Sequence, residues 1–205
     1  MTTFDENKLP DRKGYALIKA WYDQRDGKHR DGARLVIFGP TGTGKTRILG
    51  DLENRGYDER TDTYFSCVVQ TAALLENAER LCKEKMDLLT IAATDYCYKC
   101  PENAKNLGTC KRDSNNRADY PEPCDGIAID DAQDFQTKTL LGYLKAVLDT
   151  ARPVVVAIQT PEGLHLADVK AWLVRELGQT RNTLPAEAVV RRLLEPSNTI
   201  IVLSK

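Results

Sequence analysis

A glycine-rich stretch constrains the fold of this chain more than any other part of its sequence. The apolar run Arg34–Phe38 leads into it, and helical character begins directly after it at Arg47. The stretch itself consists of Gly39, Pro40, Thr41, Gly42, Thr43, Gly44, Lys45 and Thr46. A strand, a G-x-x-x-x-G-K-[ST] loop and a helix in this order are typical of a phosphate-binding loop, whose backbone N–H groups and helix N-terminus face an anion. The sequence therefore predicts a site for a nucleoside triphosphate, ATP with Mg²⁺.

Two side chains of this loop have distinct predicted roles. Lys45 is expected to reach the β- and γ-phosphates, which makes it a candidate catalytic residue as well as a ligand of ATP. The hydroxyl of Thr46 is expected to bind Mg²⁺. The alternative is a chance turn of glycine and threonine, which is disfavoured because a predicted strand and a predicted helix flank the loop.

The composition fits one α/β domain with a small insertion. The chain has 205 residues, of which 41% are hydrophobic, so it can bury a sizeable core. Its net charge of −1 gives no general attraction to nucleic acid, so a DNA contact has to be local. No apolar run approaches the roughly 18 residues that cross a bilayer, and the N-terminus lacks the pattern of a signal peptide. We expect a cytoplasmic protein without a membrane partner, and a virus or mobile element is one candidate source.

Apolar strands alternate with amphipathic helices along the chain. Strands are predicted at 34–38, 63–69, 126–131, 153–158 and 199–203, and helices at 14–22, 47–54, 71–85, 137–150, 169–177 and 186–194. Because each strand is apolar throughout, this order predicts a three-layer α/β fold with a mainly parallel sheet covered on both faces. Residues 1–13 are polar and are predicted to be a flexible arm, residues 14–205 form the main domain, and residues 94–125 are inserted in it.

A pair of carboxylates ends the predicted strand at 126–131. Asp130 and Asp131 stand at the carboxyl end of this strand, and ligands bind at that edge in open α/β sheets. The glycine-rich loop opens at the same edge. We therefore expect Asp130 to bind Mg²⁺ together with Thr46, and Asp131 to activate the attacking water. The alternative is a pair that only caps the following helix.

Three further polar residues are candidate catalytic residues. Gln159 follows the apolar strand at 153–158, where its side chain is expected to lie between the metal carboxylate and the γ-phosphate. A simple turn at the strand end explains it equally well. Arg191 and Arg192 precede the last strand and are expected to act as arginine fingers in the site of a neighbouring subunit. A solvated helix face is the alternative for both.

The order of these motifs resembles the core of AAA+ ATPases, within the additional-strand division of P-loop enzymes. The pair Asp130-Asp131 follows the loop, the strand ending in Gln159 comes next, and Arg191-Arg192 precedes a final strand. The paired aspartates are similar to those of replicative helicase loaders and of the ATPase subunits of transposition systems. The resemblance covers most of residues 14–205. It implies an oligomeric ATPase that acts on DNA together with a partner helicase, recombinase or transposase.

Other families share single features with this chain. Residues 129–135 resemble the helicase motif written DEAQD, and residues 156–161 resemble the glutamine-bearing strand of viral DNA-packaging ATPases. Outside the DNA-acting families, some nucleoside monophosphate kinases have this length and carry a four-cysteine zinc lid. A nucleotide-binding module without turnover is the remaining alternative.

The inserted segment at 94–125 carries four of the six cysteines. They are Cys97, Cys100, Cys110 and Cys124. One C-x₂-C pair with two further cysteines supplies the four thiolates of a closed structural zinc site, and the segment has too few apolar residues to fold without such a staple. A [4Fe–4S] cluster and unligated thiols or disulfides are the alternatives. The segment also carries basic residues that would suit a nucleic-acid contact, namely Lys99, Lys105, Lys111, Arg112 and Arg117.

Overall fold

The computed structural model describes residues 9–23, 33–54, 67–73, 75–76, 126–149, 153–178 and 183–205. The strands in this part of the chain are β1 Arg34–Gly39, β2 Cys67–Gln70, β3 Gly126–Ile129, β4 Val154–Gln159 and β5 Thr199–Val202. The helices are α1 Arg12–Asp23, α2 Lys45–Asn54, α6 Lys138–Leu148, α7 Leu166–Leu177 and α8 Thr183–Leu193, and a short 3₁₀ helix, η5, spans Ala132–Asp134. None of the described helices has the length and apolarity that crossing a bilayer requires.

The strands form one sheet in the order β2-β3-β4-β1-β5, and every strand pair is parallel. The predicted α/β fold with a mainly parallel sheet is therefore confirmed. β4 lies between β1, which leads into the glycine-rich loop, and β3, which leads into the two aspartates. This inserted strand agrees with the additional-strand division that the motifs resemble. In a parallel sheet all carboxyl ends lie at one edge, so the loops after β1, β3 and β4 meet there.

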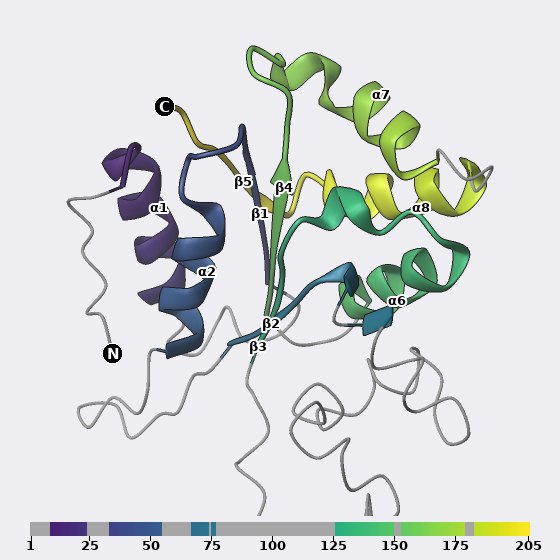
Figure 1. Cartoon of the computed structure of the whole chain (residues 1–205), viewed down its shortest axis with the longest axis horizontal. Helices are drawn as coiled ribbons and strands as arrows, with labels where there is room; N and C mark the ends of the chain where they lie inside the picture. The colour runs from purple at the N-terminus through teal and green to yellow at the C-terminus, as the bar shows by residue number, and fades with distance from the viewer. Residues whose placement is uncertain are drawn as a thin grey trace, which may run out of the picture.

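Helices cover both faces of the sheet (Figure 1). α1 and α2 lie on one side, and α6, α7 and α8 lie on the other. Successive side chains of a strand point to opposite faces, and β1 shows the result: Leu35 and Ile37 belong to the core beneath α1 and α2, whereas Val36 and Phe38 belong to the core beneath α6 to α8. This alternation explains why the central strands are apolar throughout.

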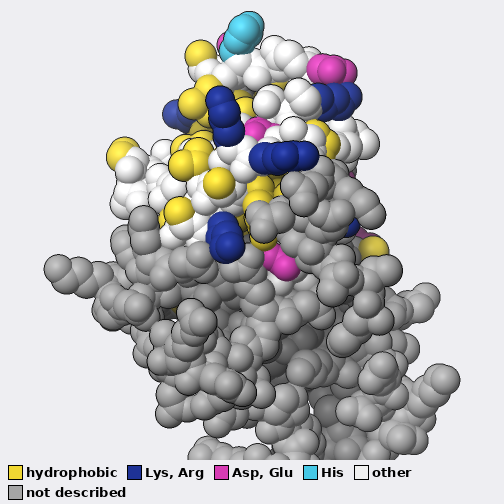
Figure 2. Space-filling model, turned by 90° about the vertical axis from the view of Figure 1, so that its left-hand side faces the viewer, with side chains coloured by type: hydrophobic (Ala, Val, Ile, Leu, Met, Phe, Trp, Pro, Cys, Tyr) yellow, Lys and Arg dark blue, Asp and Glu magenta, His cyan; other side chains and the backbone are white. Residues whose placement is uncertain are grey.

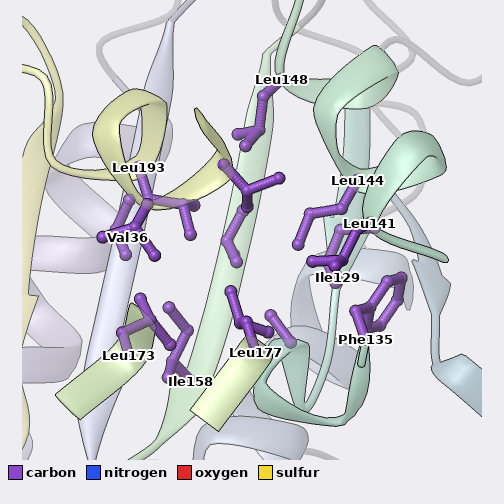
Figure 3. Packing of buried hydrophobic residues seen from close by; sticks show 14 of the residues in the cluster. Val36, Ile129, Phe135, Leu141, Leu144, Leu148, Ile158, Leu173, Leu177 and Leu193 are labelled. Carbon is purple, nitrogen blue, oxygen red and sulfur yellow. The ribbon is translucent and has the colours of Figure 1, made fainter. Parts of the chain in front are cut away.

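The larger of the two cores joins the sheet to α6, α7, α8 and η5 (Figure 3). Ile129 and Ile158 project from β3 and β4 toward Leu144 of α6 and Leu177 of α7. Phe135, directly after η5, is completely buried in the same core. That burial holds the turn after β3 against the sheet, and the turn carries both aspartates.

Most predicted elements agree with the structure to within a few residues. Helix α6 begins after Thr137, whose hydroxyl accepts a hydrogen bond from the Leu140 N–H at 3.2 Å, as an N-cap does. Helix α8 begins at Thr183, before the predicted start at 186, because Pro185 falls in its first turn, where a missing N–H costs nothing. The strand predicted at 126–131 ends earlier, at Ile129, and Asp130 and Asp131 belong to the turn after it.

The segment before α1 is packed where the structure describes it. Leu9 is only 4% exposed, and its side chain lies against the backbone of Gly44 in the glycine-rich loop. Asp11 accepts hydrogen bonds from the N–H groups of Gly14, at 2.8 Å, and Ser204, at 2.9 Å. Burial by itself would raise the pKa of Asp11, but these hydrogen bonds hold it below its ordinary value. Leu9 and Asp11 thus contact the glycine-rich loop and Ser204. Residues 1–8 lie outside the described part, and the flexible arm predicted for residues 1–13 stays a prediction.

Candidate functional site

Three loops meet at the carboxyl ends of β1, β3 and β4, an edge of the sheet that we call the carboxyl edge. Gly39 of β1 is paired with Gln159 of β4, and the N–H of Thr160 donates to the Gly39 carbonyl at 3.1 Å. The turn after β3 lies on the other side of β4. The glycine-rich loop and the two aspartates are therefore brought to one edge, as the sequence predicted.

The loop at residues 39–46 has the backbone that its glycines allow. Gly42 and Gly44 have φ angles of 86° and 88°, a region that glycine enters without steric cost and other residues seldom adopt. The Thr43 hydroxyl donates to the Pro40 carbonyl at 2.9 Å and closes the turn. Helix α2 begins at Lys45, directly after this turn. The loop thus ends at a helix N-terminus, whose N–H groups and dipole favour an anion.

Lys45 lies at the centre of this loop rather than in solvent. Its side chain is 6% exposed, and its Nζ donates to the carbonyls of Gly39, at 2.7 Å, and Pro40, at 3.0 Å. Burial lowers the pKa of Lys45, while the negative charges of Asp131 and Asp130 act in the opposite direction. A cation held within the loop by carbonyls is available to a phosphate oxygen, which can replace those acceptors.

Thr46 and Asp130 are in direct contact. The hydroxyl of Thr46 is hydrogen-bonded to the carboxylate of Asp130, which is 2% exposed. Burial raises the pKa of Asp130, and the hydrogen bond from Thr46 opposes that effect. A hydroxyl and a carboxylate side by side are hard oxygen ligands of the kind that Mg²⁺ prefers. The donor set therefore fits the predicted metal, with Thr46 and Asp130 as the residues that would hold it.

Asp131 has an unusual backbone conformation. Its φ and ψ are both 49°, and it is the one non-glycine residue with positive φ in the described part of the chain. Aspartate tolerates this left-handed region better than most residues, and such conformations are concentrated at functional sites. The Asp131 N–H donates to the Asp130 carboxylate at 3.1 Å. The tight turn therefore places the two carboxylates next to each other but in different surroundings, since Asp130 is buried and Asp131 is half-buried.

Gln133 is a polar residue of this edge to which the sequence analysis gave no role. Its amide nitrogen donates to the Asp131 carboxylate at 3.2 Å, and its amide oxygen accepts from the Gln159 N–H at 2.8 Å. The signal available in the sequence was the run Asp130–Asp134, which resembles a helicase motif. The side chain of Gln159 is exposed at the end of β4, between the strands that lead to the loop and to the aspartates.

Arg191 and Arg192 lie away from the carboxyl edge. They end α8, just before the amino end of β5, at the opposite edge of the sheet, which we call the amino edge. The Arg192 guanidinium forms an ion pair with Asp149 at 2.7 Å and a longer one with Glu195 at 3.8 Å. Within the described residues Arg191 is exposed and makes no ion pair. Neither arginine therefore reaches the loop of its own subunit.

The four cysteines predicted to bind metal lie outside the described residues. In the ranges that the structure does describe, no group of three or more His, Cys, Asp or Glu side chains is arranged to hold a metal ion. The zinc site and its cluster alternative therefore stay predictions from the sequence.

Comparisons with known proteins give matches among solved structures only. No protein-family model matches the sequence, and no curated protein matches it. The DnaC helicase loader matches with a TM-score of 0.51 and 14% identity, over 92% of this chain and 88% of that one. PCH-2 of C. elegans and the Hef helicase domain of Pyrococcus furiosus also match, each with 14% identity over 92% of this chain. They have TM-scores of 0.37 and cover 40% and 37% of those chains, so we base nothing on them.

The likeness to the DnaC helicase loader extends over nearly the whole of both chains, but at 14% identity it concerns the fold. In this chain, β4 is inserted between the loop strand and the aspartate strand. The chain therefore shares its fold with the DnaC helicase loader, in agreement with the resemblance of its motifs to helicase loaders.

Proposed function

We propose that this protein binds Mg-ATP at the carboxyl edge and hydrolyses it. The observation that carries this proposal is the hydrogen bond between Thr46 and Asp130. It joins the last residue of a phosphate-binding loop to a buried carboxylate on another strand, and the pair is the oxygen ligand set that a phosphate-bound Mg²⁺ requires. The pair is not explained by a contribution to stability. A buried aspartate whose pKa is raised destabilises the folded state at neutral pH, where its carboxylate is charged.

The residues of the carboxyl edge divide the work of hydrolysis among them. Bound Mg-ATP supplies the phosphoanhydride bond that is broken and the metal charge that offsets the phosphate charge. The N–H groups of the loop and the Lys45 ammonium hold the phosphates, and Thr46 and Asp130 hold the metal. Asp131 orients the attacking water and accepts its proton, as a carboxylate at a strand end does in related chemistry. Gln159, exposed at the end of β4, is the residue we assign to sensing the γ-phosphate.

We assign the arginine finger to Arg191, acting on a neighbouring subunit. Arg192 is held by Asp149 within its own chain, at 2.7 Å, whereas Arg191 is exposed and projects from the same helix end. A cation on the far side of the γ-phosphate is worth several orders of magnitude in turnover. Since neither arginine lies at the carboxyl edge of its own subunit, the proposal requires an oligomer.

The proposed substrate of the ATPase cycle is a DNA assembly. What supports it is the fold likeness to a helicase loader together with the resemblance of the motifs to loaders and transposition ATPases. The partner would then be a helicase, recombinase or transposase. The described face over α1 and α2 shows separate Lys and Arg side chains, with acidic side chains as well as hydrophobic and uncharged ones between them (Figure 2). With a net charge of −1, DNA binding should rest on few phosphate contacts and weaken only moderately with salt.

We also propose that the inserted segment at 94–125 holds zinc through its four cysteines. The support is the spacing Cys97-x₂-Cys100 with Cys110 and Cys124, which supplies the thiolates of a structural site. Elemental analysis of the purified protein should give about one zinc per chain. Finding iron and labile sulfide would instead indicate a [4Fe–4S] cluster. Finding a folded protein without metal would show that the four cysteines do not form a metal site.

Phosphate release from Mg-ATP tests the proposed function. It should be saturable, should rise more than linearly with protein concentration because subunits complete each other's sites, and should increase with added DNA. Directional movement along DNA would favour a helicase-like or packaging motor. Stimulation by a nucleoside monophosphate, with release first-order in protein and indifferent to DNA, would favour the kinase. Binding of Mg-ATP without release would leave a binding module.

A further inference from the structure

We propose that Gln133 is a positioning residue that fixes the carboxylate of Asp131 relative to the end of β4 and thereby sets the rate of hydrolysis. It does this without contributing to nucleotide affinity. This inference rests on the proposed function and adds to it a residue that acts through Asp131 rather than on ATP.

The orientation of the Gln133 amide is fixed by its two partners. The main-chain N–H of Gln159 can only donate, so the group that faces it at 2.8 Å has to be the amide oxygen. The amide nitrogen then faces the Asp131 carboxylate at 3.2 Å, and it also lies 3.4 Å from the Asp134 carboxylate. Both ends of the amide are therefore used, and reversing it would place like dipoles against both partners.

Asp131 depends on this contact for its orientation. In the described part of the chain, Gln133 supplies the one side-chain hydrogen bond that Asp131 receives. The backbone of Asp131 is in the left-handed region, where the carboxylate of an isolated aspartate has several accessible rotamers. A water-orienting carboxylate has to be held closely, because a misplacement of about 1 Å can cost roughly a hundredfold in rate.

The other end of the amide is anchored to the nucleotide-binding loop through β4. Gln159 is paired in the sheet with Gly39, and the N–H of the next residue, Thr160, donates to the Gly39 carbonyl at 3.1 Å. Gln133 therefore connects Asp131 to the strand that lies beside the loop. Contacts between packed, hydrogen-bonded groups of this kind are a physical route for coupling two sites.

Two substitutions separate positioning from a structural role. Gln133→Glu keeps an oxygen that accepts from the Gln159 N–H but replaces the donor facing Asp131 by a second carboxylate. Gln133→Met has a similar length and loses both bonds. We expect each variant to lower kcat about tenfold or more, with KM for Mg-ATP within about twofold of wild type. Gln133→Glu should melt closer to wild type than Gln133→Met because it keeps the bond to β4.

The matched control is Gln136→Glu. It introduces the same charge three residues later, and the side chain it alters donates to the Gln133 carbonyl at 3.4 Å rather than to Asp131. Its kcat should stay near wild type. A Gln133→Glu enzyme as fast as wild type would overturn the inference, since it would show that only the bond to Gln159 matters. If Gln133→Glu and Gln136→Glu lower kcat by the same factor, the inference is also overturned, because the loss would then come from the added charge rather than from the contact with Asp131.

A double-mutant cycle distinguishes failure of this inference from failure of the proposed function. If Gln133 acts through Asp131, Gln133→Met should cause little further loss of kcat in an Asp131→Asn background. If the kcat of the double variant falls by the product of the two single losses, Gln133 acts independently of Asp131. That result would overturn the inference but not the proposed ATPase activity. If the Asp131→Asn variant instead hydrolyses ATP as fast as the wild type, Asp131 does not have the role given to it in the proposed function. The inference about Gln133 would then fail as well.

Discussion

The two edges of the sheet use charged residues in opposite ways. At the amino edge, Arg192 is paired with Asp149, which also accepts from Lys145 at 3.0 Å. Arg34 donates to the Leu148 carbonyl from its Nε and Nη2 atoms, at 3.1 and 2.9 Å. Burial lowers the pKa of Arg34, but the charges of Asp149 and Glu195 counter it. Arg34 and Arg192 therefore have partners that offset the partial removal of their charges from water.

The carboxyl edge leaves the cost of burial partly unmet. Burial raises the pKa of Asp130 and lowers the pKa of Lys45, and within the described part of the chain the Lys45 ammonium donates to two neutral carbonyl oxygens. In both cases burial disfavours the charged form of the side chain. The comparison teaches that the amino edge ties α6, α8 and β1 together, whereas the carboxyl edge is arranged for charges that arrive with a ligand. Groups whose pKa values are perturbed by burial and by neighbouring charges cluster at functional sites.

The sharpest way to break this comparison is to remove the cation of the carboxyl edge. Lys45→Ala should abolish the thermal stabilisation that Mg-ATP gives, because the main positive group facing the phosphates is lost. Differential scanning fluorimetry with and without Mg-ATP measures this. If Mg-ATP stabilises the variant as much as the wild type, Lys45 does not face the nucleotide. Lys145→Ala, at the amino edge, serves as the control, and Mg-ATP should stabilise it as much as it stabilises the wild type.

The next largest effect should separate the two neighbouring arginines. Arg191→Ala is expected to reduce ATP turnover by about tenfold or more with little change in melting temperature, because its predicted role lies in another subunit's site. Mixing this variant with an Asp131→Asn variant should restore part of the activity. At some interfaces of the mixed oligomer, Arg191 of the Asp131→Asn subunit meets the site of an Arg191→Ala subunit, which keeps Asp131. Activity that Arg191→Ala leaves unchanged would remove it as the finger.

A smaller effect concerns the stability of the carboxyl edge itself. The pKa of Asp130 is raised in the folded state, so its contribution to stability is present at low pH and is lost as pH rises through the folded-state pKa. Without Mg²⁺, Asp130→Asn should therefore raise the melting temperature at neutral pH by a few degrees. The difference from wild type should shrink as the pH falls toward the ordinary carboxyl range. A variant that melts lower at neutral pH would mean that the charge is already compensated.

The smallest effect is expected at the amino edge. Arg192→Ala removes an ion pair whose two side chains are each 34% exposed, so the loss of unfolding free energy should be under about 1 kcal/mol. Urea unfolding of Arg192→Ala and Arg191→Ala gives the comparison. Equal stability of the two variants would show that the pair with Asp149 contributes nothing.

Much of this fold could be predicted because local sequence and global arrangement agree. Strand β1 is apolar throughout since both of its faces are covered, and Thr137 marks the start of α6 by capping it. The loop at residues 39–46 and its contact with Asp130 followed from glycine spacing and from the common edge of parallel strands. These features depend on periodicity and backbone geometry, which the sequence carries directly.

Other features depend on contacts between distant segments and left no local signal. The packing of Leu9 on the loop involves an apolar residue in a polar stretch, and the bond of Asp11 to Ser204 joins the two ends of the described chain. The bridge from Gln133 to Gln159 spans two strands. The distinction between Arg191 and Arg192 required the position of Asp149, which belongs to another helix end.

Phosphate release from Mg-ATP by wild type and by Asp131→Asn, with binding of Mg-ATP measured on the same samples, tests the central claim most directly. The wild type should bind and release phosphate in a Mg²⁺-dependent, saturable manner. The variant should bind with wild-type affinity and release phosphate at least about tenfold more slowly, because it keeps the loop but loses the water-orienting carboxylate. Equal release by both proteins, or binding by the wild type without any release, would contradict the account of the carboxyl edge as a site of ATP hydrolysis.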